Sequence, residues 1–142
     1  MSGEEFSEPG YSPLHRILVV EDNEQTAYLL KFFLERAGYS VITAANGRVA
    51  QEVLDNVPPV DLILLDLMLP YVSGYQIIID ARESPTWRNV PIIVVSGRAL
   101  EMDVVRALDM GANEYVTKPF RPEELLARVR RVIANSESGV AA

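Results

Sequence analysis

Residues 61–70 read DLILLDLMLP and give the clearest indication of the fold. Its aliphatic run, Leu62 to Leu65, contains no polar residue that could face solvent, which is typical of a strand buried on both faces of a parallel sheet. Asp66 ends the run, and Pro70 lies in the loop that follows. We therefore predict that Asp61 to Asp66 form the central strand of the domain.

Four further segments are predicted to be strands of the same sheet. They are Arg16 to Val20, Tyr39 to Thr43, Pro91 to Ser96 and Glu114 to Thr117. Because ligands bind beyond the carboxyl ends of the strands in an open parallel sheet, polar residues at these ends are expected to meet at one edge. The residues at this predicted edge are Glu21, Asp22, Asp66, Ser96 and Lys118.

Helices are predicted between and after the strands, at residues 24–37, 47–56, 74–83, 100–110 and 122–134. Asn23 can cap the first helix and Gly38 can end it, while Pro122 suits the first turn of the last helix. This order of elements predicts an α/β domain with right-handed crossovers. The chain is too short for an eightfold barrel, so we expect a doubly wound five-stranded parallel sheet with five helices.

The composition is that of a single domain. The chain has 142 residues, 49% of them hydrophobic, no cysteine and a formal net charge of -7. These values exclude a disulfide framework and argue against a broad nucleic-acid surface, which is usually basic. No apolar run has the length of a membrane helix, and the acidic N-terminus lacks the features of a signal peptide. We expect a soluble cytoplasmic protein with a flexible leader at residues 1–13, a domain at 14–135 and a disordered tail at 136–142.

The acids predicted at the sheet edge would destabilise one another. Glu21, Asp22 and Asp66 would repel, and each would resist ionisation alone. A bound Mg²⁺ would remove this conflict, because it prefers oxygen ligands and often shares its shell with a phosphate. Taken singly, Glu21 and Asp22 could merely cap the next helix, and Asp66 could be a loop acid. Together with the ammonium of Lys118 and the hydroxyl of Ser96, they predict a site for a divalent cation and a phosphoryl group.

A wider set of motifs surrounds this predicted site. It consists of Glu21-Asp22, Asp66 followed by LMLP and Gly74, Ser96, and Tyr115 with Lys118-Pro119. The set resembles the receiver domain of two-component response regulators, and the likeness covers about residues 16–135. This resemblance implies a CheY-like, flavodoxin-like sheet with strand order 2-1-3-4-5.

The resemblance also implies a role for each residue at the sheet edge. Asp66 would accept a phosphoryl group from a histidine kinase or a histidine phosphotransfer protein. Asp22, Asp66 and the main-chain carbonyl of Met68 would ligate Mg²⁺, and Glu21 would bind it through water. Lys118 would pair with Asp66 and then with the phosphoryl group. Water would later hydrolyse the acyl phosphate, so the chain would be a signalling protein that assists only its own phosphorylation and dephosphorylation.

Further implied roles concern the response to phosphorylation. Ser96 and Tyr115 would form a switch pair, in which the hydroxyl moves toward the phosphoryl group and the aromatic ring turns inward. Such a switch is a population shift between two packings, so the phosphoryl group must favour one of them. Met68 and Arg98 occupy positions that tune dephosphorylation in the family, and the direction of their effect does not follow from the sequence.

The last third of the chain carries a second resemblance. It includes VRALDMGANEYVTKPF at residues 105–120 and EELLARVR at residues 123–130. This segment is similar to receivers of the OmpR/PhoB subfamily, which dimerise through the fourth helix, fifth strand and fifth helix. Asn113 departs from that pattern, where an acid is usual. The resemblance implies a homodimer formed on phosphorylation, with ion pairs between subunits from Arg106, Glu114, Glu124 and Arg128.

The output of the domain is not specified by these motifs. Eight residues follow the last predicted helix, so we favour a stand-alone receiver. The alternatives are a receiver fragment of a longer DNA-binding or other output-domain regulator, and a pseudo-receiver that binds partners without phosphorylation.

A phosphatase of the haloacid-dehalogenase type would need an Asp-x-Asp pair, which Asp66-Leu67-Met68 lacks. A flavin carrier is disfavoured because no phosphate-binding loop follows the first strand. We expect no direct contact of this domain with nucleic acid or membrane.

Overall fold

The structure is a computed structural model that describes residues 15–98 and 100–137. Within these residues, strands and helices alternate strictly along the chain. The elements are β1 (Arg16–Val20), α1 (Glu24–Arg36), β2 (Ser40–Ala44), α2 (Gly47–Asn56), β3 (Leu62–Leu65), α3 (Gly74–Glu83), β4 (Ile92–Ser96), α4 (Glu101–Met110), β5 (Glu114–Thr117) and α5 (Pro122–Glu137).

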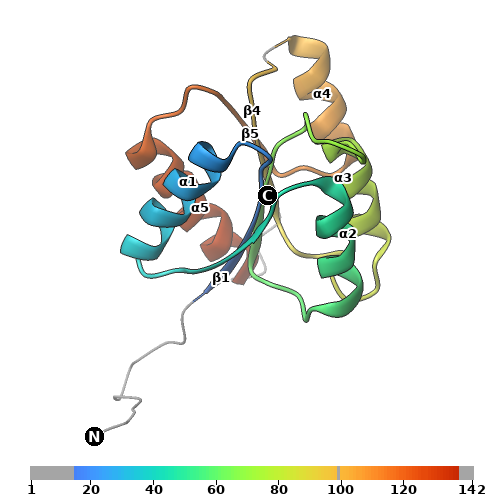
Figure 1. The fold of residues 1–142 in the computed structure, drawn as a ribbon, viewed down its shortest axis with the longest axis horizontal. Helices are drawn as coiled ribbons and strands as arrows, with labels where there is room; N and C mark the ends of the chain where they lie inside the picture. Colours follow the sequence, from blue (N-terminus) through green and yellow to red (C-terminus); the bar gives the residue numbers. More distant parts are fainter. Residues whose placement is uncertain (1–14, 99, 138–142) are drawn as a thin grey trace, which may run out of the picture.

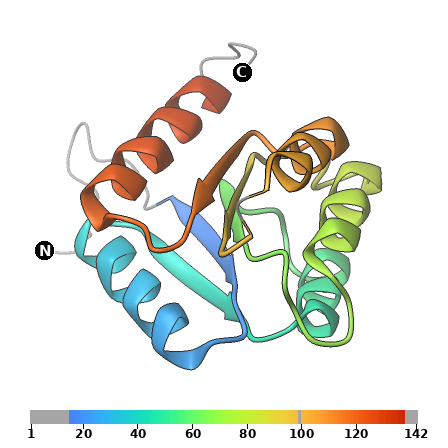
Figure 2. The same cartoon turned by 90° about the horizontal axis from the view of Figure 1, so that it is seen from above.

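The five described strands form one parallel sheet in the order β2-β1-β3-β4-β5, which confirms the predicted fold. The sheet is the middle layer of three (Figure 1). Helices α1 and α5 cover one face, and α2, α3 and α4 cover the other, as the view from above shows (Figure 2). Two layers of helix on a parallel sheet are the expected arrangement for alternating β and α elements.

Burial on both faces explains the uninterrupted aliphatic runs. Successive strand side chains point to opposite faces, so Ile63 and Leu65 pack toward α2, α3 and α4, whereas Leu62 and Leu64 pack toward α1 and α5. All four side chains are buried. Because β3 lies between β1 and β4, Asp66, which directly follows β3, lies in the middle of the sheet edge.

The cap predicted at Asn23 is confirmed, and Asn46 caps the second helix in the same way. The side chain of Asn23 accepts a hydrogen bond from the backbone N–H of Thr26 at 2.9 Å, and Asn46 accepts one from Val49 at the same distance. An amide oxygen at this position satisfies one of the backbone donors that the first turn of a helix leaves unpaired. The first two helices therefore begin at the predicted residues.

Several predicted boundaries are wrong. α1, β3, β4 and α4 are each one or two residues shorter than predicted, and β2 and α5 differ at their ends. β2 is Ser40–Ala44 rather than 39–43, because its register with β1 pairs Arg16 with Ser40. α5 continues three residues beyond the predicted end at 134, so residues 136 and 137, which we expected in a disordered tail, are helical. His15 Nε2 lies 2.5 Å from Glu137 Oε2, a contact that ties this last turn to the start of β1. The expected leader at residues 1–13 and the rest of the tail lie outside the described residues.

The sole tryptophan is a core residue. Trp87 follows α3 and is 0% exposed, and its indole Nε1–H donates to the backbone oxygen of Val57 at 3.2 Å. Val57 is the residue that follows α2, so this contact ties the C-terminal ends of α2 and α3 together. Among the described helices, none combines the length and the apolar character needed to cross a membrane.

Candidate functional site

Backbone hydrogen bonds between neighbouring parallel strands continue beyond the ends of the strands. They fix the backbone of the predicted site. The N–H of Glu21 donates to Ala44 O at 3.0 Å, and that of Asp66 donates to Val20 O at 3.0 Å. The N–H of Lys118 donates to Ser96 O at 2.9 Å. Residues that are distant in sequence are thus brought to one edge of the sheet, as predicted from the strand order.

Three carboxylates meet at this edge. One oxygen from each of Glu21, Asp22 and Asp66 lies within 4.8 Å of the others. Glu21 is 3% exposed and Asp66 is 6% exposed, whereas Asp22 is open to solvent. The cluster therefore has two acids that cannot be fully hydrated and one that faces water.

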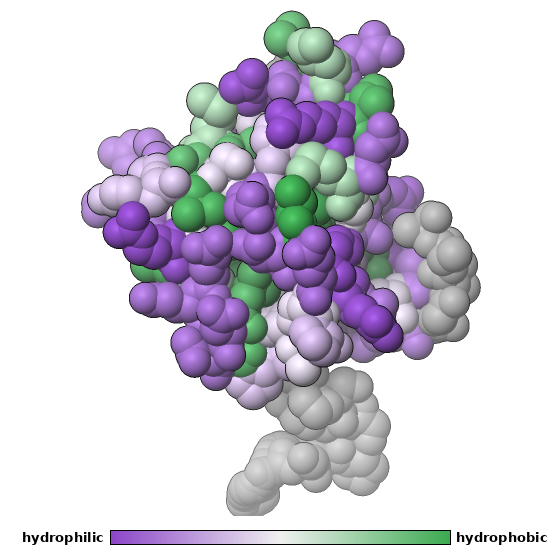
Figure 3. Space-filling model, turned by 90° about the vertical axis from the view of Figure 1, so that its right-hand side faces the viewer, coloured by the Kyte–Doolittle hydropathy of each residue, from purple (hydrophilic) through white to green (hydrophobic). Residues whose placement is uncertain are grey.

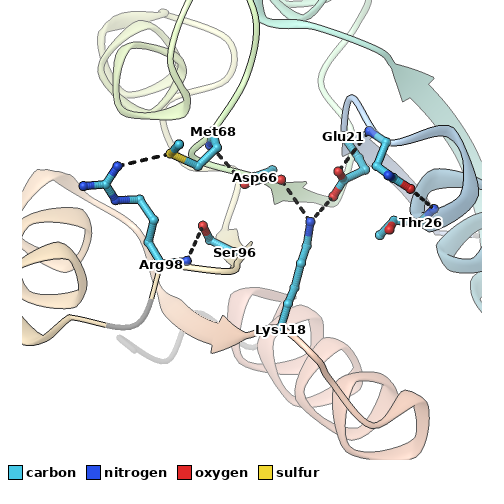
Figure 4. Close-up of polar contacts among 8 residues, drawn as sticks. Glu21, Thr26, Asp66, Met68, Ser96, Arg98 and Lys118 are labelled. Carbon is cyan, nitrogen blue, oxygen red and sulfur yellow. Dashed lines mark hydrogen bonds and ion pairs between the residues drawn. The ribbon is translucent and has the colours of Figure 1, made fainter.

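Lys118 bridges the two buried acids. Its ammonium Nζ lies 2.7 Å from Glu21 Oε1 and 3.0 Å from Asp66 Oδ2 (Figure 4). Burial alone would lower the pKa of Lys118, but the hydrogen bonds and charges of Glu21 and Asp66 outweigh it, and the pKa is raised. The lysine is consequently held in its charged form across the neutral pH range.

The lysine does not balance the acidic charge. Burial raises the pKa of Glu21, and the charge of Asp66 adds to that effect, so that the pKa stays above its ordinary value despite the ion pair with Lys118. Three carboxylates share a single ammonium here, so one positive charge is too few for this cluster when all three are ionised. A second, divalent cation would supply what is missing.

The donor set fits Mg²⁺. All three side chains offer carboxylate oxygens, the ligand type that this hard cation prefers, and the exposure of Asp22 leaves room for the water ligands that Mg²⁺ retains. The two buried acids are oriented by backbone donors: Asp66 Oδ1 accepts from the N–H of Met68 at 3.0 Å, and Glu21 Oε2 accepts from that of Asn23 at 3.2 Å. The predicted contribution of the Met68 carbonyl stays a prediction, because no described contact locates that oxygen.

The predicted switch residues lie on the neighbouring strands β4 and β5 and are joined through Arg98. Ser96 is fully buried, and its Oγ accepts from the N–H of Arg98 at 3.3 Å. Tyr115 is half-buried, and its hydroxyl donates to the backbone oxygen of Arg98 at 2.5 Å. The backbone of Arg98, which follows β4, thus contacts the side chains of both Ser96 and Tyr115. A movement of one of these side chains could therefore be transmitted to the other.

The residues predicted for a subunit interface form contacts within the chain. Arg128 lies 2.9 Å from Glu114 and 3.0 Å from Glu124, and Arg131 also pairs with Glu114. Arg106 instead stacks on the ring of Tyr75, 4.0 Å from its centroid. The use of these residues between two copies of the chain stays a prediction.

The side chain of Asn113 joins three segments of the chain. Its side-chain oxygen accepts from the backbone N–H of Ile92 at 2.8 Å and from Arg82 Nη2 at 3.0 Å. Arg82 also donates to the backbone oxygens of Gly111 and Val90. The amide therefore anchors the loop before β5 to the start of β4 and to α3.

Removal of the Glu114 charge should weaken the fold in a pH-dependent way. Burial raises the pKa of Glu114, but its bonds to Arg131 and Arg128 outweigh burial and lower the pKa overall. A depressed carboxylate pKa stabilises the folded state above the unfolded value of about 4.3 and loses this effect as the pH falls through the folded value. We expect Glu114→Gln to lower the free energy of unfolding by about 1 kcal/mol at pH 7.

The measurement is urea unfolding of wild type and Glu114→Gln at a series of pH values. The difference between the two proteins should shrink as the pH falls below about 4.3 and vanish below the folded pKa. A difference that is equally large at pH 7 and pH 3 would show that Glu114 acts through packing and not through its charge.

Sequence reasoning missed a second polar cluster beside the site. Asp103, in the first turn of α4, is buried and accepts a hydrogen bond from the hydroxyl of Tyr75 at 3.1 Å. It also pairs with Arg98 at 3.3 Å. A signal was present in the sequence, since Asp103 is spaced four residues before the buried Ala107 and so shares its face of the helix.

Comparison with known proteins places the chain in a family. The model of the response regulator receiver domain matches residues 17–130. The chain is 41% identical over 122 residues to the alkaline phosphatase synthesis transcriptional regulatory protein PhoP of Bacillus subtilis, covering 86% of this chain and 50% of that protein. It is 42% identical over 118 residues to the phosphate regulon transcriptional regulatory protein PhoB of Escherichia coli, covering 83% and 51%. The chain spans about half the length of these curated relatives.

Solved structures agree in fold. A CheY-like response regulator receiver domain protein from Methanospirillum hungatei matches with a TM-score of 0.84 and 29% identity, covering 89% of this chain and 99% of that one. The receiver domain of a sensor histidine kinase from Pseudomonas aeruginosa, which has a magnesium ion coordinated in its active-site cleft, matches with a TM-score of 0.79 and 34% identity, covering 86% and 99%. The chain belongs to the response regulator receiver domain family.

Proposed function

We propose that the domain accepts a phosphoryl group on Asp66 in a Mg²⁺-dependent reaction, with a histidine kinase or a histidine phosphotransfer protein as the donor. One observation carries the proposal: Lys118 Nζ contacts Asp66 at 3.0 Å at the point where three carboxylate oxygens lie within 4.8 Å of one another. This combination offers a nucleophilic oxygen, a fixed cation and a site for a second cation around a single carboxylate.

In the proposed reaction a carboxylate oxygen of Asp66 attacks the phosphorus of the donor. The new O–P bond forms as the bond between phosphorus and the donor's leaving atom breaks, and the leaving group departs with its electron pair and takes up a proton. Phosphoryl transfer depends mainly on positioning and charge neutralisation. Met68 N–H and Lys118 orient the carboxylate, and Lys118 neutralises charge on the transferred group.

A divalent cation held by Glu21, Asp22 and Asp66 would neutralise the remaining charge on the phosphoryl oxygens. The reaction ends when water attacks the phosphorus, which releases inorganic phosphate and restores the Asp66 carboxylate. In the phosphorylated state we propose that the hydroxyl of Ser96 bonds the phosphoryl group and that Tyr115 changes its contacts with Arg98. The site therefore acts as a switch with a limited lifetime.

The proposed output surface consists of α4, β5 and α5. Large hydrophobic side chains of α4 and the residue before it are exposed: Leu100, Met102, Val105 and Leu108. Apolar residues gather at the top of the molecule where α4 lies (Figure 3). The Glu114–Arg128 and Glu124–Arg128 pairs form a charged border on the neighbouring β5 and α5. We propose that this surface binds a protein partner, including a second copy of the chain, and that the domain itself does not contact nucleic acid.

The test is the intact mass of the protein after incubation with acetyl phosphate, with Mg²⁺ and with the metal chelated. We expect one phosphoryl adduct with Mg²⁺ and almost none without it, because the uncompensated acids repel an anionic donor. Size-exclusion chromatography of the labelled protein then tests the output surface, with a dimer as the expected result. The absence of an adduct at saturating Mg²⁺ would support a pseudo-receiver instead.

A further inference from the structure

A buried acid outside the Mg²⁺ cluster is linked to the phosphoacceptor by three successive contacts. Asp103 is 6% exposed, and its Oδ1 accepts a hydrogen bond from the hydroxyl of Tyr75 at 3.1 Å and lies 3.3 Å from Arg98 Nε. Its Oδ2 is buried and has no hydrogen-bond partner in the described part of the chain. Burying a carboxylate is costly unless a cation accompanies it, so Arg98 is the main compensation for this charge.

Arg98 is the link between this acid and the site. Its Nη1 lies 3.2 Å from the sulfur of Met68, and the backbone N–H of Met68 donates to Asp66. In Figure 4 the guanidinium lies on the Met68 side of Asp66, opposite Lys118. The Arg98 side chain is 46% exposed, so it has free space around it and is not locked in place by packing.

Phosphorylation would create a competitor for Arg98. A phosphoryl group carries close to two negative charges at neutral pH, and an arginine is well suited to bind it. A guanidinium that turned toward that group would leave Asp103, whose ion pair uses Nε of Arg98. The buried carboxylate would then keep only the Tyr75 hydroxyl and the more distant charge of Arg106, which is stacked on the Tyr75 ring. Leaving a buried charge so poorly paired opposes the movement.

We propose that Asp103 is a positioning residue that holds Arg98 on α4 and thereby weakens the affinity of the Asp66 site for a phosphoryl group. The inference rests on the function proposed above, because it needs a phosphoryl group at Asp66. Asp103 contacts neither Asp66 nor the phosphoryl group and acts only through Arg98. The strength of the Arg98–Asp103 pair sets how readily the site takes up and retains the phosphoryl group.

Beryllofluoride, an anionic mimic of a phosphoryl group on a carboxylate, provides an equilibrium test. Its affinity in the presence of Mg²⁺ is measured by calorimetric titration for wild type and Asp103→Asn. Asparagine keeps an oxygen for the Tyr75 hydroxyl and removes the charge that holds Arg98. We expect Asp103→Asn to bind the probe about fivefold more tightly, a size typical of one half-exposed ion pair. Asp103→Ser removes the same charge with a smaller side chain and should give the same gain, so the result does not depend on the folding of one variant.

Two comparisons separate positioning from a general structural effect. In an Arg98→Gln background, Asp103→Asn should give no gain, since the arginine through which it acts is gone. Tyr75→Phe removes the other hydrogen bond to Asp103 and leaves the ion pair, so its affinity should stay within about twofold of wild type. An equal gain with and without Arg98, or no gain in either Asp103 variant, overturns the proposal. If wild type itself does not bind the probe, the proposed function fails together with it.

Discussion

Replacement of Asp66 by asparagine should abolish the phosphoryl adduct, with labelling by acetyl phosphate at least about a hundredfold slower than in wild type. The amide is neutral, so the variant loses the attacking carboxylate oxygen and one of the three acids at the edge. It also loses the ionic partner that lies 3.0 Å from Lys118. The measurement is the time course of intact mass with acetyl phosphate and Mg²⁺.

The matched control is Asp55→Asn, which makes the same chemical change at an exposed acid of α2. This variant should be labelled at the wild-type rate. Labelling of Asp66→Asn as fast as the control would mean that another side chain is the acceptor, and the role proposed for Asp66 would be abandoned.

A methyl group at Gly74 should strongly destabilise the fold. A Cβ built on Gly74 would lie 2.3 Å from the backbone oxygen of Asp66 and 2.6 Å from the Cα of Leu67. Both atoms belong to the backbone, so no side chain can move aside to make room. α3 or the end of β3 has to shift, and we expect Gly74→Ala to lower the free energy of unfolding by about 2–4 kcal/mol.

Gly97→Ala is the control for this prediction, because a Cβ at Gly97 would meet no atom within 4 Å among the described residues other than its chain neighbours. Its effect should be smaller than about 0.5 kcal/mol. Urea unfolding followed by circular dichroism measures both variants. If Gly74→Ala were as stable as Gly97→Ala, the close approach of α3 to the phosphoacceptor strand would be disproved.

The convergence of the site was predictable because it follows from topology and not from side-chain detail. Strand order places Asp66 between its neighbours, and parallel direction puts Glu21 and Lys118 at the same edge. The strand bounds were less secure, since β2 begins at Ser40 through its register with Arg16 rather than through any local signal. A pairing partner far along the chain decides such a boundary.

The contacts around Asp103 could not be derived from the sequence. They depend on how α3 and α4 pack together, which brings Tyr75 and Asp103 within 3.1 Å across 28 residues of chain. Arg82 illustrates the same limit, because its partners Gly111 and Asn113 lie about thirty residues away. Helical spacing identifies the buried face of α4, but it does not identify the cation that compensates an acid on that face.

The burial of Trp87 decides what an optical experiment on this protein can detect. Its indole is shielded from water and donates a hydrogen bond to the backbone oxygen of Val57, at the C-terminal ends of α2 and α3. In a parallel α/β domain those ends lie at the edge of the sheet opposite Asp66. Since this is the only tryptophan of the chain, its emission reports whether the domain is folded. Occupancy of the phosphoacceptor site should leave that emission unchanged, so ligand titrations require a fluorophore introduced near the other edge.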